Sequence, residues 1–325
     1  MNFKLRPIPV LLLLALALIG SSLAAQPLFT VALPGWAGAV AFSNDGKRLA
    51  VGTADGAARV LQADDGRVVA VLKEHTDAVG ALAFTPDGQR VITGSFDGTA
   101  RIWNVQAARS EWTLRSHRGA VMSVSVSSDG QTIATAGIDS TIKLWNPASG
   151  ELRATLSGHK LWVNAIVFSA DGNTLFSGSS DGTVKIWDVP AHRLTTTIEA
   201  TLAEVRSVAL SPGGDTLAAG LRYGTVKTWI VPAGKESLSF KGHDADVWAV
   251  AFHPIRPVFI TGDGDWNRPG QVKFWNSASG ALLAQLPTAG EVLALACSPD
   301  GRHVAVGCWN KKLEVWDVPD AAVPR

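Results

Sequence analysis

A fixed spacing of bulky apolar residues is the feature that most limits how this chain can fold. In chain order, the repeated position is held by Leu61, Trp103, Trp145, Trp187, Trp229, Trp275 and Trp316. The first five lie 42 residues apart, and the last two steps are 46 and 41 residues. A period of this length indicates a supersecondary unit that is repeated seven times and buries its apolar face against its neighbours.

Each copy also carries the same internal order of motifs. In the fourth copy, Gly158-His159 precedes an alternating apolar run, a turn, a second run, Asp181-Gly182 and Trp187-Asp188. Alternating runs bounded by turns that contain Gly and Asp are typical of short antiparallel strands. The 32 glycines of the chain agree with many short strands joined by tight turns.

On these residues the chain resembles the WD-repeat β-propeller family over residues 26–318, although the literal Trp-Asp pair occurs only at Trp187-Asp188 and Trp316-Asp317. The resemblance implies an all-β fold, a seven-bladed β-propeller of four-stranded antiparallel blades. It also implies a structural hydrogen-bond chain in each complete copy, running from Trp to Ser or Thr to His to Asp. The complete sets are His75, Thr93, Asp97 and Trp103; His117, Thr135, Asp139 and Trp145; and His159, Ser177, Asp181 and Trp187.

The same residue types could be taken for a nucleophilic triad. However, the His-to-Asp distance is 22 residues in all three sets, and three identical copies fit a repeated structural role better than one active site. The first, fifth and seventh copies have Leu33, Thr201 and Thr288 in place of the His. We therefore predict no catalytic residues and a protein that is not an enzyme.

The copies divide the chain into one propeller with short flanking segments. We expect the propeller to occupy residues 25–320, followed by a tail at 321–325. The copies cover approximately 34–74, 75–116, 117–158, 159–200, 201–242, 243–287 and 288–318, with a strand from 26–33. The seventh copy ends before its fourth strand, so the segment 26–33 is predicted to supply that strand and to close the ring, which leaves no open sheet edge at the joint.

Residues 1–24 have the pattern of a secretory signal peptide. Lys4 and Arg6 precede an uninterrupted apolar run from Val10 to Ile19 and a small-residue exit. Cleavage after Ala24 fits the exit better than cleavage after Ala25, and a retained anchor is the alternative. The expectation is export, to the bacterial periplasm or out of the cell, with no stable membrane insertion after processing.

Composition excludes several function classes. The formal net charge is +1, which leaves no broad basic footprint for nucleic acid. No common metal, haem, nucleotide or hydrolase motif occurs, so we predict no cofactor and no metal. Asp263, Asp265 and Asn267 alternate like the start of a calcium loop, but Arg268 stands where that loop requires Gly, so a hairpin at 263–270 is favoured. The two cysteines, Cys297 and Cys308, are predicted to be too far apart along their hairpin to form a disulfide, with Cys308 opposite about Glu291.

Function in a repeat fold is sought where the copies differ, because the shared positions are accounted for by folding. Five tryptophans outside the repeat position, together with arginines, are expected at one rim of the ring. The predicted binding residues are Trp36, Trp162, Arg206, Arg222, Trp248, Trp266, Arg268 and Trp309. Aromatic residues mixed with Arg are typical of a protein-binding hot spot.

We therefore predict a monomeric, non-catalytic scaffold that binds a protein or peptide partner through this rim. The alternative is a propeller that holds a small ligand or carbohydrate, with or without catalysis, over the central channel on the same rim. A third interpretation gives the tryptophans a purely structural role, as plugs of the channel.

Overall fold

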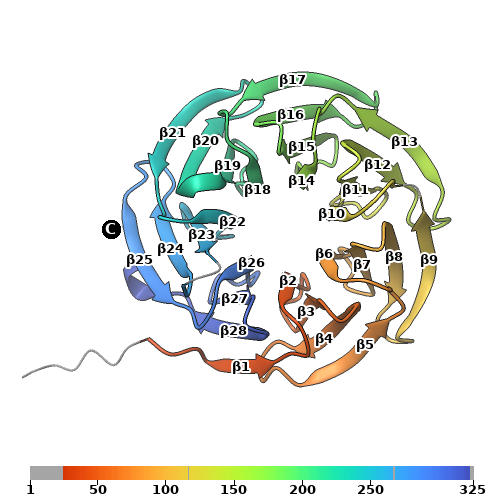
Figure 1. Cartoon of the computed structure of the whole chain (residues 1–325), viewed down its shortest axis with the longest axis horizontal. Helices are drawn as coiled ribbons and strands as arrows, with labels where there is room; N and C mark the ends of the chain where they lie inside the picture. Colours follow the sequence, from red (N-terminus) through yellow and green to blue (C-terminus); the bar gives the residue numbers. More distant parts are fainter. Residues whose placement is uncertain (1–24, 116, 266–267, 323–325) are drawn as a thin grey trace, which may run out of the picture.

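The protein is a closed ring of seven antiparallel sheets around a central channel (Figure 1). The computed structural model describes residues 25–115, 117–265 and 268–322, and within these ranges the chain forms strands β1 to β28 and two short 3₁₀ turns. The predicted fold class, a seven-bladed propeller of four-stranded blades, is confirmed. The predicted signal peptide at 1–24 lies outside the described residues.

Every blade runs outward from the channel in chain order. The first three blades are β2 (Ala37–Phe42), β3 (Arg48–Thr53), β4 (Ala57–Gln62) and β5 (Val68–Lys73); β6 (Val79–Phe84), β7 (Arg90–Ser95), β8 (Thr99–Asn104) and β9 (Arg109–Arg115); and β10 (Val121–Val126), β11 (Ile133–Gly137), β12 (Thr141–Trp145) and β13 (Leu152–Ser157). The fourth and fifth are β14 (Val163–Phe168), β15 (Thr174–Ser179), β16 (Thr183–Asp188) and β17 (Arg193–Glu199); and β18 (Val205–Leu210), β19 (Thr216–Leu221), β20 (Thr225–Ile230) and β21 (Lys235–Lys241), with the turn η1 (Arg222–Gly224) between β19 and β20. The sixth is β22 (Asp246–Phe252), β23 (Val258–Gly264), β24 (Gln271–Asn276) and β25 (Leu282–Pro287).

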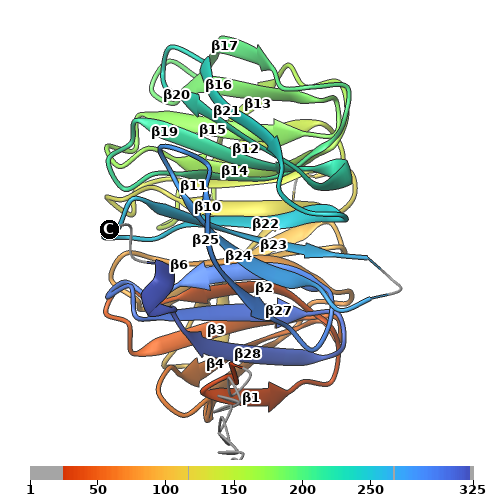
Figure 2. The ribbon, with the colours of Figure 1, turned by 90° about the vertical axis from the view of Figure 1, so that its left-hand side faces the viewer.

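The seventh blade joins the two ends of the chain. It consists of β26 (Val292–Cys297), β27 (His303–Cys308), β28 (Lys312–Asp317) and, as its outer strand, β1 (Phe29–Ala32). β1 pairs antiparallel with β28, with Phe29 opposite Val315, and the two strands lie side by side in both views of the ring (Figures 1 and 2). The N-terminal segment therefore closes the ring as the sequence predicts.

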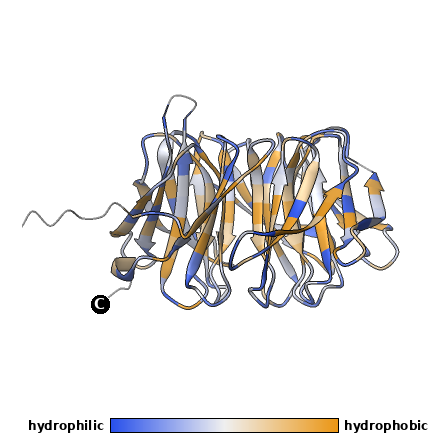
Figure 3. Ribbon diagram, turned by 90° about the horizontal axis from the view of Figure 1, so that it is seen from below, coloured by the Kyte–Doolittle hydropathy of each residue, from blue (hydrophilic) through white to orange (hydrophobic). Residues whose placement is uncertain are grey.

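The hydrophobic core is divided among the interfaces between neighbouring blades. Seven buried clusters each combine residues of two adjacent blades. Trp103, for example, packs with Ala58, Val60 and Leu72 of the preceding blade and is 1% exposed. Figure 3 shows hydrophobic segments running along the strands and much hydrophilic sequence in the loops. Burying a side chain of this size stabilises the fold by about 2–3 kcal/mol, so the repeated tryptophan explains much of the 42-residue period.

The innermost strand of every blade carries a register shift of the β-bulge type near its start. In the second blade, for example, Val79 pairs with Ser95 and Ala81 with Gly94, so Gly80 is left between the two pairs. The shifted positions in chain order are Gly38, Gly80, Met122, Asn164, Arg206, Trp248 and Leu293. We call these seven residues the bulge ring. A bulge redirects the side chain of the extra residue, and here it directs one residue per blade towards the channel.

The chain after the last strand also joins the core. The turn η2 (Asp320–Ala322) follows β28, and Ala322 is 1% exposed within the cluster between the sixth and seventh blades. The boundary predicted at residue 320 is therefore too early, because the first residues of the predicted tail pack against β25.

Candidate functional site

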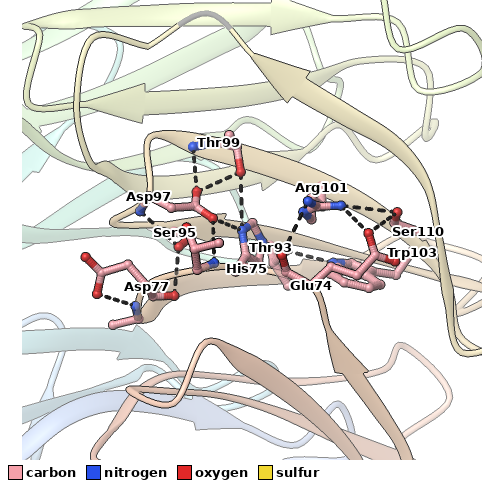
Figure 4. Close-up of polar contacts among 12 residues, drawn as sticks. Glu74, His75, Asp77, Thr93, Ser95, Asp97, Thr99, Arg101, Trp103 and Ser110 are labelled. Atoms are coloured by element: carbon pink, nitrogen blue, oxygen red, sulfur yellow. Dashed lines mark hydrogen bonds and ion pairs between the residues drawn. The ribbon is translucent and has the colours of Figure 1, made fainter.

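The repeated polar set is a closed hydrogen-bond chain in the second blade (Figure 4). Trp103 Nε1 donates to Thr93 Oγ1 over 2.8 Å, His75 Nε2 lies 2.7 Å from the same hydroxyl, and His75 Nδ1 lies 2.8 Å from Asp97 Oδ2. A carboxylate can only accept, so His75 Nδ1 carries the proton and its Nε2 accepts from Thr93. This tautomer is the neutral imidazole. All of its polar atoms are used within the blade, which leaves no group free to attack a substrate.

Electrostatics agrees with a neutral histidine beside a charged aspartate. Burial lowers the pKa of His75, and the Asp97 carboxylate only partly offsets this effect. Burial would raise the pKa of Asp97, but hydrogen bonds from Thr99 and His75 lower it to about 2. The side chain of His75 is fully buried, so its imidazole has no contact with solvent.

The third and fourth blades repeat this geometry. In the third, His117 lies 2.8 Å from Thr135 and 3.0 Å from Asp139. In the fourth, His159 lies 2.7 Å from Ser177 and 2.9 Å from Asp181. Trp145 and Trp187 donate to the hydroxyls of Thr135 and Ser177, respectively. Burial also lowers the pKa values of His117 and His159, and hydrogen bonds lower those of Asp139 and Asp181 to about 2.

A fourth set, in the sixth blade, escaped the sequence prediction. His243 Nε2 lies 2.6 Å from Thr261 Oγ1, to which Trp275 Nε1 donates over 2.7 Å. Asp263 lies 3.3 Å from His243 Nδ1. The longer hairpin of this copy removes the 22-residue His-to-Asp distance, but the 18 residues from His243 to Thr261 match the other copies and were the signal available.

The remaining blades lack this set and use different contacts in its place. In the first blade, Arg59 pairs with Asp55 over 2.6 Å and donates to Thr53. In the seventh, the buried Glu314 accepts from the indole of Trp316 over 3.2 Å. The fifth has Ala219 where the other blades have a hydroxyl, and its loops are held by arginine ion pairs.

The departures from the repeat meet in a cavity at one mouth of the channel. The cavity has a volume of about 640 Å³, and all seven bulge-ring residues line it. It opens at the rim that is formed by the loops before the inner strands and the loops between the second and third strands of each blade. We call this the mouth rim. Trp36, Trp162, Trp248 and Trp309 also line the cavity, and so do Arg206, Phe96 and Glu291.

One wall of the cavity is aromatic. Trp36 and Trp309 stack with their ring centroids 5.7 Å apart and their planes 10° apart, and Trp36 lies 5.9 Å from Phe96. A Cβ atom at Gly38 would lie 2.3 Å from the Trp36 ring, and one at Gly80 would lie 2.7 Å from Phe96. The two glycines of the bulge ring therefore make room for these rings.

The opposite wall is polar. The Arg206 guanidinium lies 4.5 Å from the ring centroid of Trp248 and pairs with Glu204 over 2.7 Å and with Asp246 over 3.2 Å. Asn164 donates to Ser180 Oγ and to the carbonyl oxygen of Val205. The cation is thus held over the indole by two carboxylates, an arrangement that keeps the Trp248 ring in place.

The other predicted rim residues have different environments. Trp162 is 49% exposed beside the cavity, whereas Arg222 pairs with Glu204 and stacks on Tyr223. Arg268 lies 3.6 Å from Asp263 and 3.8 Å from Asp244 and does not line the cavity. Trp266 lies outside the described residues.

Two details of the predicted rim need correction. Trp248 lies within strand β22 at the bulge position and not in a rim loop, because the register shift turns this residue towards the channel. Glu291 and Phe96, which line the cavity, were not predicted as binding residues. Their only sequence signal was a departure from the other copies at a mouth-rim position.

The segment 263–270 forms a hairpin between β23 and β24, with a β-bridge between Asp265 and Arg268. The Asp263 carboxylate is occupied by the backbone N–H of Gln271, at 2.6 Å, and by His243. Within the described ranges, no group of three His, Cys, Asp or Glu residues is arranged to hold a metal ion.

The two cysteines are free, as the hairpin geometry predicts. Cys297 is opposite Val304, and Cys308 is opposite Val292, one residue from the predicted position because of the bulge after Val292. Burial raises the pKa of both thiols, which keeps them protonated and unreactive.

Comparison with known families agrees with this geometry. Residues 105–323 match the family model of the IFT122 first beta-propeller, and residues 28–61 and 66–104 match the WD domain, G-beta repeat. The chain belongs to this family of WD-repeat propellers. No curated protein matches the chain.

WD-repeat propellers are typically non-enzymatic scaffolds that mediate protein interactions. The satisfied polar sets of this propeller agree with that role, because their hydrogen bonds are internal to the blades. Among the described residues, no helix is both long enough and apolar enough to cross a bilayer.

Proposed function

We propose that this propeller is a non-catalytic scaffold that binds a protein or peptide partner at its mouth rim. The observation that carries the proposal is the concentration of exposed apolar side chains on this rim around the cavity. These residues are Phe96, Leu161, Trp162, Leu202, Tyr223 and Trp309. Leu202 is fully exposed, Leu161 is 52% exposed, and only folding-independent selection for binding gives such positions a reason to be apolar.

The polar wall of the cavity supports the same proposal. Interface hot spots combine Trp or Tyr with Arg in a sheltered pocket that is surrounded by more exposed residues. Trp248 and Arg206 form such a pair at the wall of the cavity, and Trp162 and Trp309 are at its open edge. The partner would cover the exposed residues and extend into the cavity.

The test compares two tryptophans that are similarly exposed but lie on different surfaces. Trp162 on the mouth rim is 49% exposed, and Trp112 on the outer strand β9 is 42% exposed. A photo-crosslinking amino acid at position 162 should capture a partner in the cell of origin, and the same group at position 112 should not. Trp248→Ala should weaken capture by about tenfold, which corresponds to ~1.4 kcal/mol. Equal capture from both positions would contradict the proposal.

A small-ligand function is the second candidate, because the cavity volume of about 640 Å³ is in the range of small-molecule sites. On this alternative, which includes a carbohydrate ligand, the rim residues would stack on the ligand. Native mass spectrometry of the purified protein distinguishes the two functions. A retained small molecule without any protein crosslink from position 162 would favour the alternative.

The proposed setting is the cell envelope, on the strength of the signal-peptide pattern at residues 1–24. Intact mass spectrometry of the protein from its own cells should give a chain that begins at Ala25 or Gln26. A chain that begins at Met1 and is recovered with the membranes would contradict export.

A further inference from the structure

Three buried polar atoms without a hydrogen-bond partner belong to residues that line the cavity. They are Arg206 Nε, Trp248 Nε1 and Glu291 Oε2, and they are three of eight such atoms among the residues that the structure describes. Buried polar groups are normally paired, because an unpaired one costs about 1–3 kcal/mol. Three of them at one cavity indicate that a polar ligand completes the site.

The uncompensated charge in this group is negative. Arg206 is neutralised by Glu204 and Asp246, while Glu291 has no basic side chain within ion-pair distance. Arg268 reaches Asp263 and Asp244 and not Glu291. Glu291 is 5% exposed and therefore receives little compensation from water.

The surroundings of Glu291 favour the approach of a cation. Burial raises the pKa of the Glu291 carboxyl; the nearby Trp248 indole opposes this rise, and Asp265, Asp246 and Asp263 add to it. A cation beside Glu291 would relieve this repulsion. The Trp309 backbone N–H donates to the Glu291 carbonyl oxygen over 2.9 Å, so an aromatic residue that lines the cavity emerges directly beside the carboxylate's strand end.

The lining also restricts the kind of cation. A guanidinium group binds a carboxylate best through two parallel hydrogen bonds, which require both oxygens, whereas an ammonium group is a point charge that one oxygen can hold. Only Oε2 of Glu291 is without a partner. The adjacent lining includes Ala249, Leu293 and Ala294, which suit a flexible aliphatic stem.

We propose that Glu291 anchors the ammonium group of a lysine side chain, which the partner of the proposed scaffold inserts into the channel mouth. This inference rests on the proposed function. The indole N–H of Trp248 and Nε of Arg206 are then available to main-chain carbonyl oxygens of the same segment, so the three unpaired atoms are satisfied by one lysine-containing peptide.

The experiment measures binding of three short peptides to the mature protein by protein-observed NMR at millimolar peptide concentration. The probes are acetyl-Leu-Lys-Leu-amide, its norleucine analogue, which keeps the stem without the charge, and its arginine analogue. The lysine peptide should bind about tenfold more tightly than the norleucine peptide and more tightly than the arginine peptide. Free n-hexylammonium should bind more weakly than the lysine peptide because it lacks main-chain carbonyl groups.

Glu291→Gln should bring the lysine and norleucine peptides to within about twofold of each other, with the norleucine affinity unchanged. Glu204→Gln, on the same rim, is the matched control and should keep the lysine preference. Equal binding of the three peptides to the wild type, no binding of the lysine peptide, or an unchanged preference in Glu291→Gln would each overturn the inference. The wild-type comparison decides the matter even if Glu291→Gln fails to fold.

The two proposals fail in different ways. If position 162 captures a protein partner but the lysine preference is absent, the scaffold stands and the Glu291 site does not. If the lysine peptide binds but no protein partner is captured, the Glu291 site stands without the scaffold function.

Discussion

The third and fifth blades share one strand plan but are held together differently. In the third, Trp145, Thr135, His117 and Asp139 form a buried hydrogen-bond chain that ties the inner loop to the sheet. In the fifth, Ala219 replaces the hydroxyl, and Glu204 joins Arg206 and Arg222 in ion pairs at the rim.

The difference shows how a repeat fold can release positions for binding. The polar set uses its His and Asp for stability, and its atoms are internally satisfied. Where the set is absent, the loops are held at the surface, with Asp246 accepting from the backbone N–H of Tyr223 over 2.8 Å. Arg206, one of these surface groups, also faces the cavity. The fifth blade thereby joins stability and the candidate site in one network.

The largest expected effect tests the tryptophans of the two blades. Trp145→Ala and Trp229→Ala each remove a side chain that is at most 3% exposed and should each cost about 3–5 kcal/mol. Trp145→Ala should cost about 1 kcal/mol more, because it also removes the hydrogen bond to Thr135. Denaturant unfolding measures both losses. Equal losses would mean that the indole hydrogen bond adds nothing to packing.

The second prediction breaks the polar set of the third blade without changing its packing. Asp139→Ala leaves the buried His117 without its acceptor and should lower the free energy of unfolding by about 1–3 kcal/mol. Partner capture should change little at temperatures where the protein is folded. Loss of capture with an unchanged unfolding midpoint would contradict the structural role of the set.

The third prediction concerns acid. His117 has a pKa below its usual 6.5 in the folded protein, so below that pH the unfolded chain binds more protons and stability falls. Asp139 has a folded pKa of about 2 against an ordinary 3.8, so its contribution is complete above about pH 4 and is lost as the pH falls towards 2. Thermal melts across this range should show both declines, and Asp139→Asn should reduce the lower one. A stability that rises on acidification below pH 6.5 would contradict this assignment.

The smallest expected effect concerns the ion pairs of the fifth blade. Glu204→Gln removes the pairs with Arg206 and Arg222, whose side chains are partly exposed, and should cost at most about 1 kcal/mol. The loss should shrink at high salt, whereas the loss in Asp139→Ala should not, because the His117–Asp139 pair is buried. Melts at two salt concentrations make this comparison. A large, salt-independent loss in Glu204→Gln would show that the two blades are held in the same way.

Much of the architecture was predictable because it depends on patterns that recur along the chain. The 42-residue spacing led to seven blades, the short seventh copy led to ring closure by 26–33, and the constant His-to-Asp distance led to three polar sets. The set of His243 was missed for a physical reason. Its aspartate is brought close by a longer hairpin, so its sequence separation differs although its position in space is similar.

The candidate site was predictable only in outline. The position of Trp36 and Trp309 in neighbouring copies suggested one patch, but their stacking depends on how the two ends of the chain meet at the closed ring. Glu291 had no distinguishing sequence signal, since its burial arises from the approach of Gly264, where an added Cβ would lie 1.9 Å from the Glu291 Cγ.

The sequence by itself determined the number of blades, their strand order and the residues that hold the complete copies together, because these depend on local periodicity and on turns within one repeat. Only the tertiary structure decided which residues face the channel. A shift of one residue in register redirects a side chain, and each inner strand makes that shift against its own neighbour. Arg206, Trp248 and Glu291 therefore meet at one cavity through register and ring closure, two properties of the assembled sheets that no single repeat contains.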